Sequence, residues 1–144
     1  AYDEKGLRMI MRTWFTQSPL FTVLKKIAET DSIVVITTDH GSILGKKGIK
    51  AFGRKDTSTN LRYKYGDNLN ADMKGAILIK NPAEYKLPTF SVTTNYIIAL
   101  ENYYFLYPSN FRQFEKQYKD SVLHGGISID EMIIPCVTML PKNR

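Results

Sequence analysis

Residues 32–38 constrain the fold most, because this stretch is rich in β-branched side chains and leads directly into Asp-His-Gly. β-Branched residues favour an extended backbone, and a strand that is apolar on both faces is typical of a sheet centre with cover on each side. Gly41 allows a sharp turn after the strand. Asp39 and His40 are therefore predicted at the carboxyl end of a central strand, the edge where open α/β sheets usually bind ligands.

Two helices are predicted before this strand. Ser18 followed by Pro19 has the pattern of a helix N-cap with proline at the first helical position, which separates the two helices. Apolar residues recur at helical spacing on both sides of that boundary. The first helix has a stripe of Leu7, Ile10, Met11, Trp14 and Phe15, and the second has an expected buried face of Leu20, Val23, Leu24, Ile27 and Ala28.

The chain after the first strand has a less regular pattern. Residues 42–88 predict an insertion rather than core, apart from a short strand at 76–80. Strands are then predicted at 95–100 and 103–107, followed by an amphipathic helix that ends at the Gly-Gly pair after His124. Ser128 and Glu131 have capping-box spacing, which predicts one helical turn before a final strand.

The net charge of +6 is concentrated in one segment. Residues 46–74 contain eight basic and three acidic residues, so this segment alone carries +5. A local surplus of this kind can attract a phosphorylated or nucleic-acid ligand, but a solvated lysine-rich segment explains it equally well. Charge alone leaves both interpretations open.

The composition indicates the cellular compartment and argues against a membrane protein. No apolar run approaches the roughly 20 residues of a membrane helix, so no membrane partner is expected. Cys136 is the only cysteine, and its place in an apolar stretch indicates a buried thiol in a reducing compartment. We expect a cytoplasmic location. The chain begins without an initiator methionine or a signal segment, which we interpret as a fragment of a longer protein.

Both histidines of the chain lie in dense motifs, His40 after Asp39 and His124 before Gly-Gly. Because a turn breaks the alternation of side chains along a strand, an Asp-His pair at a strand end can face one point and bind a divalent metal. An Asx turn would explain Asp-His-Gly without a metal. A histidine at a helix C-terminus is also favoured by the helix dipole alone.

Three stretches of the chain resemble PglZ-type domains of the alkaline phosphatase superfamily, namely residues 36–42, 57–66 and 124–135. The middle stretch is similar to PglZ domains that follow a receiver domain in PorX-like two-component response regulators. The resemblance implies an α/β fold with an alkaline-phosphatase-like core sheet flanked by helices. Residues 1–144 would form the carboxyl-terminal part of that single domain, with a basic irregular insertion at about 42–88.

The resemblance also implies a set of metal ligands. In this superfamily two zinc ions clamp the attacking and leaving oxygens of a phosphate or sulfate ester. Asp39 and His40 match the pair that holds one metal, and His124 matches a ligand of its neighbour. Asp120, four residues before His124, is interpreted as a surface acid rather than a group that orients this histidine.

The nucleophile of the superfamily is missing from the chain. An early Asp, a nucleophilic Thr or Ser and an Asp-x-x-x-His motif precede the Asp-His pair in the family, and the 38 residues before Asp39 show no such arrangement. No catalytic residue is therefore assigned within this chain. We expect the fragment alone to be inactive and the complete protein to be active.

Asn60, Arg62 and Lys64 are the candidate substrate-binding residues. Arg62 and Lys64 are two positions apart and would point the same way on an extended segment, and arginine suits bidentate contacts to phosphate. Tyr63 and Tyr65 add groups that can stack on nucleobases. The alternative is that these residues anchor the segment to the rest of the domain by polar contacts.

The resemblance therefore predicts a zinc-dependent phosphohydrolase. Its expected reaction is phosphodiester hydrolysis on nucleotides or short oligonucleotides, in the output domain of a response regulator of the kind linked to type IX secretion. Its expected partners are such a substrate, the upstream half of the domain, a receiver domain and a second copy of the chain. The alternative is a non-catalytic interaction module whose metal site is structural or vestigial.

Overall fold

A computed structural model describes residues 3–54 and 59–141. The chain forms two compact units, of which one comprises the residues up to Asp39 together with those from Ile134 onward, and the other runs from His40 to Ile133. We call them unit 1 and unit 2 and describe each by itself. Thr57 and Ser58, which begin the predicted motif at 57–66, lie outside the described residues. The single-domain assignment of residues 1–144 stays a prediction.

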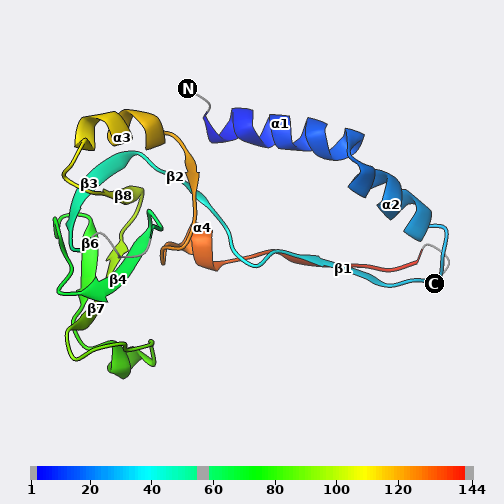
Figure 1. Ribbon diagram of the computed structural model, residues 1–144. Helices are drawn as coiled ribbons and strands as arrows, with labels where there is room; N and C mark the ends of the chain where they lie inside the picture. The colour runs from blue at the N-terminus through cyan, green and yellow to red at the C-terminus, as the bar shows by residue number, and fades with distance from the viewer. Residues whose placement is uncertain (1–2, 55–58, 142–144) are drawn as a thin grey trace. The chain divides into compact units, whose positions relative to one another are not determined.

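Unit 1 contains two helices and two strands: α1 (Glu4–Gln17), α2 (Pro19–Ile27), β1 (Val34–Thr37) and β10 (Cys136–Met139) (Figure 1). Both helices begin at side-chain caps, because Asp3 accepts a hydrogen bond from the Gly6 N–H and Ser18 accepts one from the Phe21 N–H. Pro19 occupies the first turn of α2. The two predicted helices and their boundary at Ser18 are therefore confirmed.

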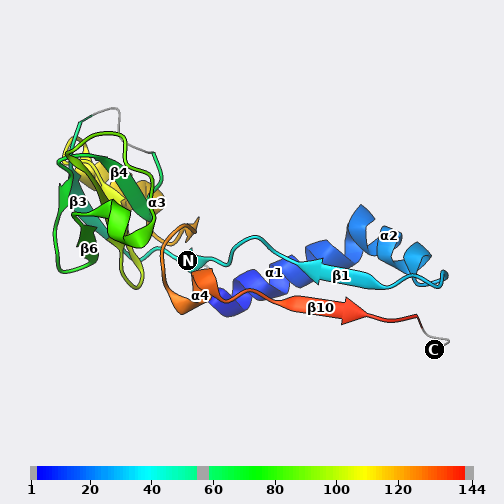
Figure 2. The same cartoon turned by 90° about the horizontal axis from the view of Figure 1, so that it is seen from below.

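The strand at residues 32–38 is confirmed as β1, but its predicted place at a sheet centre is wrong for the described chain. Within residues 3–54 and 59–141, β1 pairs only with β10, antiparallel, with Val34 opposite Met139 and Thr37 opposite Cys136 (Figure 2). Val35 is 59% exposed. β-Branched residues determine the extended backbone locally, whereas cover on each face depends on distant partners that the local pattern does not encode.

The apolar face of α2 is also more exposed than predicted. No residue of α2 is buried, and its apolar side chains line a groove of about 400 Å³ in unit 1 together with residues such as Ile36 and Met139. Cys136 is exposed, so the prediction of a buried thiol is wrong. Its strand β10 pairs only with β1 within the described residues, and all four residues of β10 are exposed.

Unit 2 contains most of the strands (Figure 1). In chain order its elements are β2 (Ile43–Leu44), β3 (Lys47–Phe52), β4 (Tyr63–Asp67), β5 (Asn70–Ala71), β6 (Ala76–Ile79), η1 (Pro82–Tyr85), β7 (Thr94–Ala99), β8 (Tyr103–Leu106), α3 (Phe111–Tyr118), β9 (Val122–Leu123) and α4 (Ile129–Met132). They form sheets of order β5-β3-β8, β4-β7-β6 and β2-β9. Only the β3–β8 pair among these is parallel. The mixture of small sheets and helices is compatible with an α/β assignment.

The main core of unit 2 lies between these strands. Its eight buried residues are Ile49, Ala51, Leu69, Ala71, Ala76, Ile97, Ala99 and Phe105. Five of the eight come from residues 42–88, so the prediction that this segment is irregular and contributes no core is wrong. The strands there are two to six residues long, which gives too few alternations for a clear period-2 pattern. Its status as an insertion in a larger fold stays a prediction.

The later elements agree better with the sequence. The strands predicted at 76–80, 95–100 and 103–107 are confirmed as β6, β7 and β8. The predicted helix before Gly-Gly ends early, at Tyr118, because Asp120 has a φ of 64° and the chain then enters β9. The capping box of Ser128 and Glu131 is confirmed at the start of α4. Of the helices in the described residues, none combines the length and apolarity needed to cross a membrane.

Candidate functional site

The two histidines lie against each other in unit 2. Their rings stack with centroids 3.8 Å apart and planes 10° apart. The cause is the antiparallel pairing of β2 with β9, in which Ile43 lies opposite Leu123, because His40 precedes β2 and His124 directly follows β9. The structure thus brings together two of the three predicted metal ligands, which are 84 residues apart in sequence.

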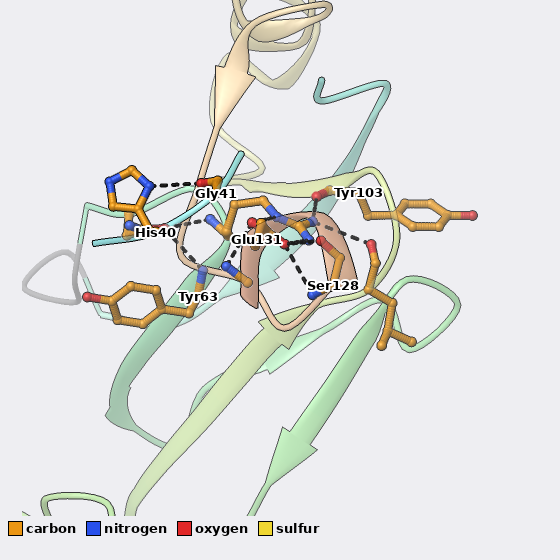
Figure 3. Close-up of polar contacts among 10 residues, drawn as sticks. His40, Gly41, Tyr63, Tyr103, Ser128 and Glu131 are labelled. Atoms are coloured by element: carbon orange, nitrogen blue, oxygen red, sulfur yellow. Dashed lines mark hydrogen bonds and ion pairs between the residues drawn. The ribbon is translucent and has the colours of Figure 1, made fainter. Parts of the chain in front are cut away.

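The ring of His40 is oriented by its own turn. Its Nδ1 lies 2.8 Å from the carbonyl oxygen of Gly41 (Figure 3). Because a carbonyl only accepts, this hydrogen bond requires a proton on Nδ1, and Nε2 is then the nitrogen with the lone pair in the neutral ring. A Cβ on Gly41 would lie 1.9 Å from the Asp130 carbonyl oxygen, so the turn after His40 packs on α4 as only glycine allows.

The loop after His124 requires both of its glycines. Gly125 has a φ of +102°, which L-residues with a side chain rarely adopt. A Cβ on Gly126 would lie 2.5 Å from Arg62 Nη2 and 2.6 Å from Glu131 Oε2. The Gly-Gly pair therefore lets the backbone beside His124 approach a buried pair of charged side chains.

That pair is Arg62 and Glu131, which form a bidentate ion pair. Arg62 Nε lies 2.9 Å from Glu131 Oε1, and Arg62 Nη2 lies 2.7 Å from Glu131 Oε2. Their side chains are 0% and 2% exposed. Arg62 Nη1 also donates to the carbonyl oxygens of Leu100 and Tyr103 (Figure 3). Four of the five N–H groups of the buried guanidinium thus have an acceptor within the described residues, which offsets much of the cost of burying its charge.

The carboxylate of Glu131 accepts hydrogen bonds from the loop that follows His124. The Gly126 N–H donates to Oε1 at 2.9 Å, and the N–H and hydroxyl of Ser128 donate to Oε2 at 3.3 and 2.7 Å. Burial alone would raise the pKa of Glu131, but the hydrogen bonds from Arg62, Ser128 and Gly126 outweigh it and lower the pKa to about 2. Glu131 is therefore charged at neutral pH.

Arg62 and Lys64 point the same way, as predicted, but they point inward. The whole residues are 0% and 2% exposed. Lys64 Nζ donates to the Asn60 carbonyl at 3.0 Å, and burial lowers the pKa of Lys64 to about 8. This arrangement corresponds to the alternative in which these residues anchor the segment. The substrate-binding assignment of Asn60, Arg62 and Lys64 stays a prediction.

Aromatic rings lie next to one another along β4 and its neighbours. Tyr63 stacks beside Tyr65 at 6.5 Å between centroids, and Tyr65 stacks on Tyr96 at 5.5 Å. Phe90 lies 5.7 Å from Tyr65 and is 71% exposed. The row starts beside the histidine loop, because a Cβ on Gly125 would lie 3.1 Å from the Tyr63 ring. We call Tyr63, Tyr65, Tyr96 and Phe90 the aromatic row.

Asp39 and Asp120 are the two acidic residues that the sequence places near the histidines. Asp39 ends the first segment of unit 1, whereas both histidines belong to unit 2, so its role as a ligand stays a prediction. Asp120 forms an ion pair with Lys46 at 2.5 Å, and both side chains are partly exposed. This contact agrees with a surface acid.

The predicted ligands are of the kinds that bind zinc, but too few of them lie together to complete a zinc site. Imidazole nitrogens and a carboxylate are common zinc ligands, and protein zinc sites provide three or four of them. In residues 3–54 and 59–141, no three His, Cys, Asp or Glu side chains lie close enough together to hold a metal ion. Each histidine therefore fits part of the coordination shell of its own metal. The identity of the metal stays a prediction.

Comparison with known proteins identifies the family of this sequence. Residues 10–139 match the family described as the BREX system PglZ alkaline phosphatase-like domain. The match includes both histidine motifs as well as Arg62 and Glu131. Among the curated proteins, none matches the chain.

Proposed function

The chain belongs to the PglZ family of alkaline phosphatase-like domains, and on that basis we propose that it is part of a metal-dependent phosphodiesterase. Membership indicates a hydrolase of the phosphoesterase type. The observation that carries the finer proposal is the stacked pair of His40 and His124. Two imidazoles from different strand ends, held by an internal network, are an arrangement suited to metal binding.

Each of the three predicted metal ligands has a stated role in this proposal. A bound zinc ion would activate the nucleophile and stabilise negative charge on the phosphoryl oxygens. His40 presents Nε2 because its Nδ1–H is held by the Gly41 carbonyl. His124 is held next to it by the β2–β9 pairing, and Asp39 supplies a carboxylate. The proposal assigns neither the nucleophile nor the remaining ligands to residues of this chain.

We propose nucleotides or short oligonucleotides as substrates. The aromatic row supports this choice, because stacking on an aromatic side chain contributes about 1–3 kcal/mol per base. Tyr65 and Phe90 expose 36% and 71% of their surface. Asn60 lies at the same end of the row as Gly125 and remains a candidate contact to substrate. Arg62 and Lys64 act in this proposal by supporting the strand that carries the row.

The proposed cellular context is the output domain of a cytoplasmic two-component response regulator. It rests on the similarity of residues 57–66 to PglZ domains of PorX-like regulators. A receiver domain on the same chain and a second copy of the protein are the partners expected in that context.

The experiment compares the full-length protein with a His124→Gln variant. The proposal expects about two zinc ions per chain and hydrolysis of bis-p-nitrophenyl phosphate, with the variant losing one metal and most activity. Asp120→Asn is the matched control, because it changes a side chain near His124 in sequence that pairs with Lys46 on the surface. A folded full-length protein that neither binds zinc nor hydrolyses phosphodiesters would overturn the proposal.

A non-catalytic interaction module is the second candidate. It is favoured by the apolar groove of about 400 Å³ in unit 1, because exposed apolar surfaces often mark interaction sites. The same experiment separates the two candidates. Zinc-free, inactive protein would support the module, and zinc-dependent turnover would exclude it.

A further inference from the structure

We propose that Arg62 and Glu131 are positioning residues that set the spacing between His40 and His124. The effect of this pair on the histidine rings is independent of the proposed function, whereas its effect on metal binding rests on that function. Neither residue contacts a histidine ring through a hydrogen bond that the structure shows; they act through the two loops that carry the rings.

Glu131 contacts both loops at once. Its backbone carbonyl accepts a hydrogen bond from the Gly41 N–H at 2.9 Å, one residue after His40. Its side chain accepts from the Gly126 N–H at 2.9 Å, two residues after His124. One residue of α4 therefore fixes the backbone beside each histidine.

Arg62 connects this residue to the sheets. It donates two hydrogen bonds to the Glu131 carboxylate. It also donates to the carbonyls of Leu100, in the turn after β7, and of Tyr103, the first residue of β8. Its own carbonyl accepts from the Ala99 N–H at 2.8 Å. Arg62 therefore connects Glu131, and with it the short helix α4, to strands β7 and β8.

Stability by itself is a weak explanation for this ion pair. A buried pair contributes little compared with apolar residues of similar volume, because two charges must be removed from water. The Arg62–Glu131 pair instead directs its hydrogen bonds to the backbone and to Ser128 in the loop after His124. Gly41 and Gly126 both permit close approach to residues of α4. Both histidine loops can therefore pack closely against Glu131.

The chain offers a direct spectroscopic readout, because it contains only two histidines. In stacked rings each Cε1–H proton experiences the ring current of the other imidazole. The two resonances in a ¹H–¹³C spectrum can be assigned with His40→Gln and His124→Gln. Their positions then report the spacing of the rings without any metal or substrate.

Glu131→Gln is the principal variant, because it keeps the size of the side chain and removes the charge that pairs with Arg62. We expect both histidine resonances to move toward the positions of unstacked rings, while the methyl signals of Ile97 and other core residues stay in place. Asp130→Asn is the matched control on the same helical turn and should move neither resonance. A folded Glu131→Gln protein with both resonances unchanged would overturn the inference.

Arg62→Lys provides a second test that does not depend on the first variant folding. It keeps the positive charge and loses the bidentate geometry, so the same resonances should move by a smaller amount. Unchanged resonances in a folded Arg62→Lys protein would refute the positioning role of Arg62.

A zinc titration of the same variants separates this inference from the proposed function. If the wild-type protein binds zinc, Glu131→Gln should weaken binding about 10–100-fold, as loss of supporting contacts around metal ligands commonly does. Equal zinc affinity in wild type and variant would overturn the consequence for metal binding. If the wild type binds no zinc but the variant still moves both resonances, the proposed function fails and the positioning role stands.

Discussion

Units 1 and 2 differ sharply in burial. In the described residues of unit 1, Ser18 is the only buried residue, and apolar side chains such as Trp14 and Val35 are more than half exposed. Unit 2 contains the main core, a second core cluster of Tyr104, Leu106 and Leu123, and the buried Arg62–Glu131 pair. Local sequence therefore specifies the elements, and long-range pairing decides which of them form a core.

The largest loss of stability is expected when the buried ion pair of unit 2 is broken. Arg62→Ala leaves the Glu131 carboxylate buried without its partner and should lower the free energy of unfolding by about 3–5 kcal/mol. Lys46→Ala breaks the partly exposed pair with Asp120 and should cost about 0–1 kcal/mol. Urea denaturation monitored by circular dichroism measures both. Similar costs for the two variants would contradict the distinction between a buried and a surface pair.

A matched pair of leucines tests the contrast between the units directly. Leu106→Ala removes a side chain from the second core cluster, where the residue is 3% exposed, and should cost about 2–5 kcal/mol. Leu20→Ala removes the same atoms from α2, where the residue is 51% exposed, and should change stability by about 0.5 kcal/mol or less. The free energies of unfolding are again compared in urea. A large loss at Leu20 would show that its face is covered in solution.

Acid should weaken unit 2 through Glu131. Burial would raise the pKa of Glu131 above its ordinary value of 4.5, but hydrogen bonds from Arg62, Ser128 and Gly126 outweigh burial and lower the pKa in the folded protein to about 2. Between these values the unfolded state binds the proton, so a contribution of about 3 kcal/mol is present above pH 4.5 and is lost as the pH falls toward 2. Denaturation from pH 6 to pH 2 measures it. Glu131→Gln should remove this part of the slope, and an unaltered slope in the variant would assign it to other acids.

The smallest change in the free energy of unfolding is expected at the exposed strand β1 of unit 1. Val35→Thr changes a residue that is 59% exposed on β1 and should alter the free energy of unfolding by about 0.5 kcal/mol or less. Thermal unfolding of the variant beside the wild type is sufficient to measure this. A clear loss would mean that another surface packs on β1 in the protein studied.

The sequence predicted much of the fold because several signals are local. Ser18 with Pro19 marks a helix start through backbone hydrogen bonding within one turn, and Ser128 with Glu131 does the same for α4. The segment at 42–88 was misjudged because its strands are short and its core includes small residues such as Ala51 and Ala71, which give little hydrophobic pattern.

The site was predicted only in part for a similar reason. His40 and His124 were identified from their motifs, but their contact depends on the pairing of β2 with β9, two residues from each strand. Glu131 was noted as a helix cap, and its partnership with Arg62 could not be inferred from a separation of 69 residues. The places of Arg62 and Glu131 in two motifs of the same family resemblance are the one sequence signal that could have suggested the pair.

The contact between the two histidine rings is the central claim, and a nuclear Overhauser experiment on the protein tests it most directly. Stacking with ring centroids 3.8 Å apart predicts cross-peaks between ring protons of His40 and His124. Resonances assigned with His40→Gln and His124→Gln identify these cross-peaks. Their presence would place both imidazoles in one site, and their absence from a protein whose Ile97 and Phe105 signals show a folded core would contradict that site.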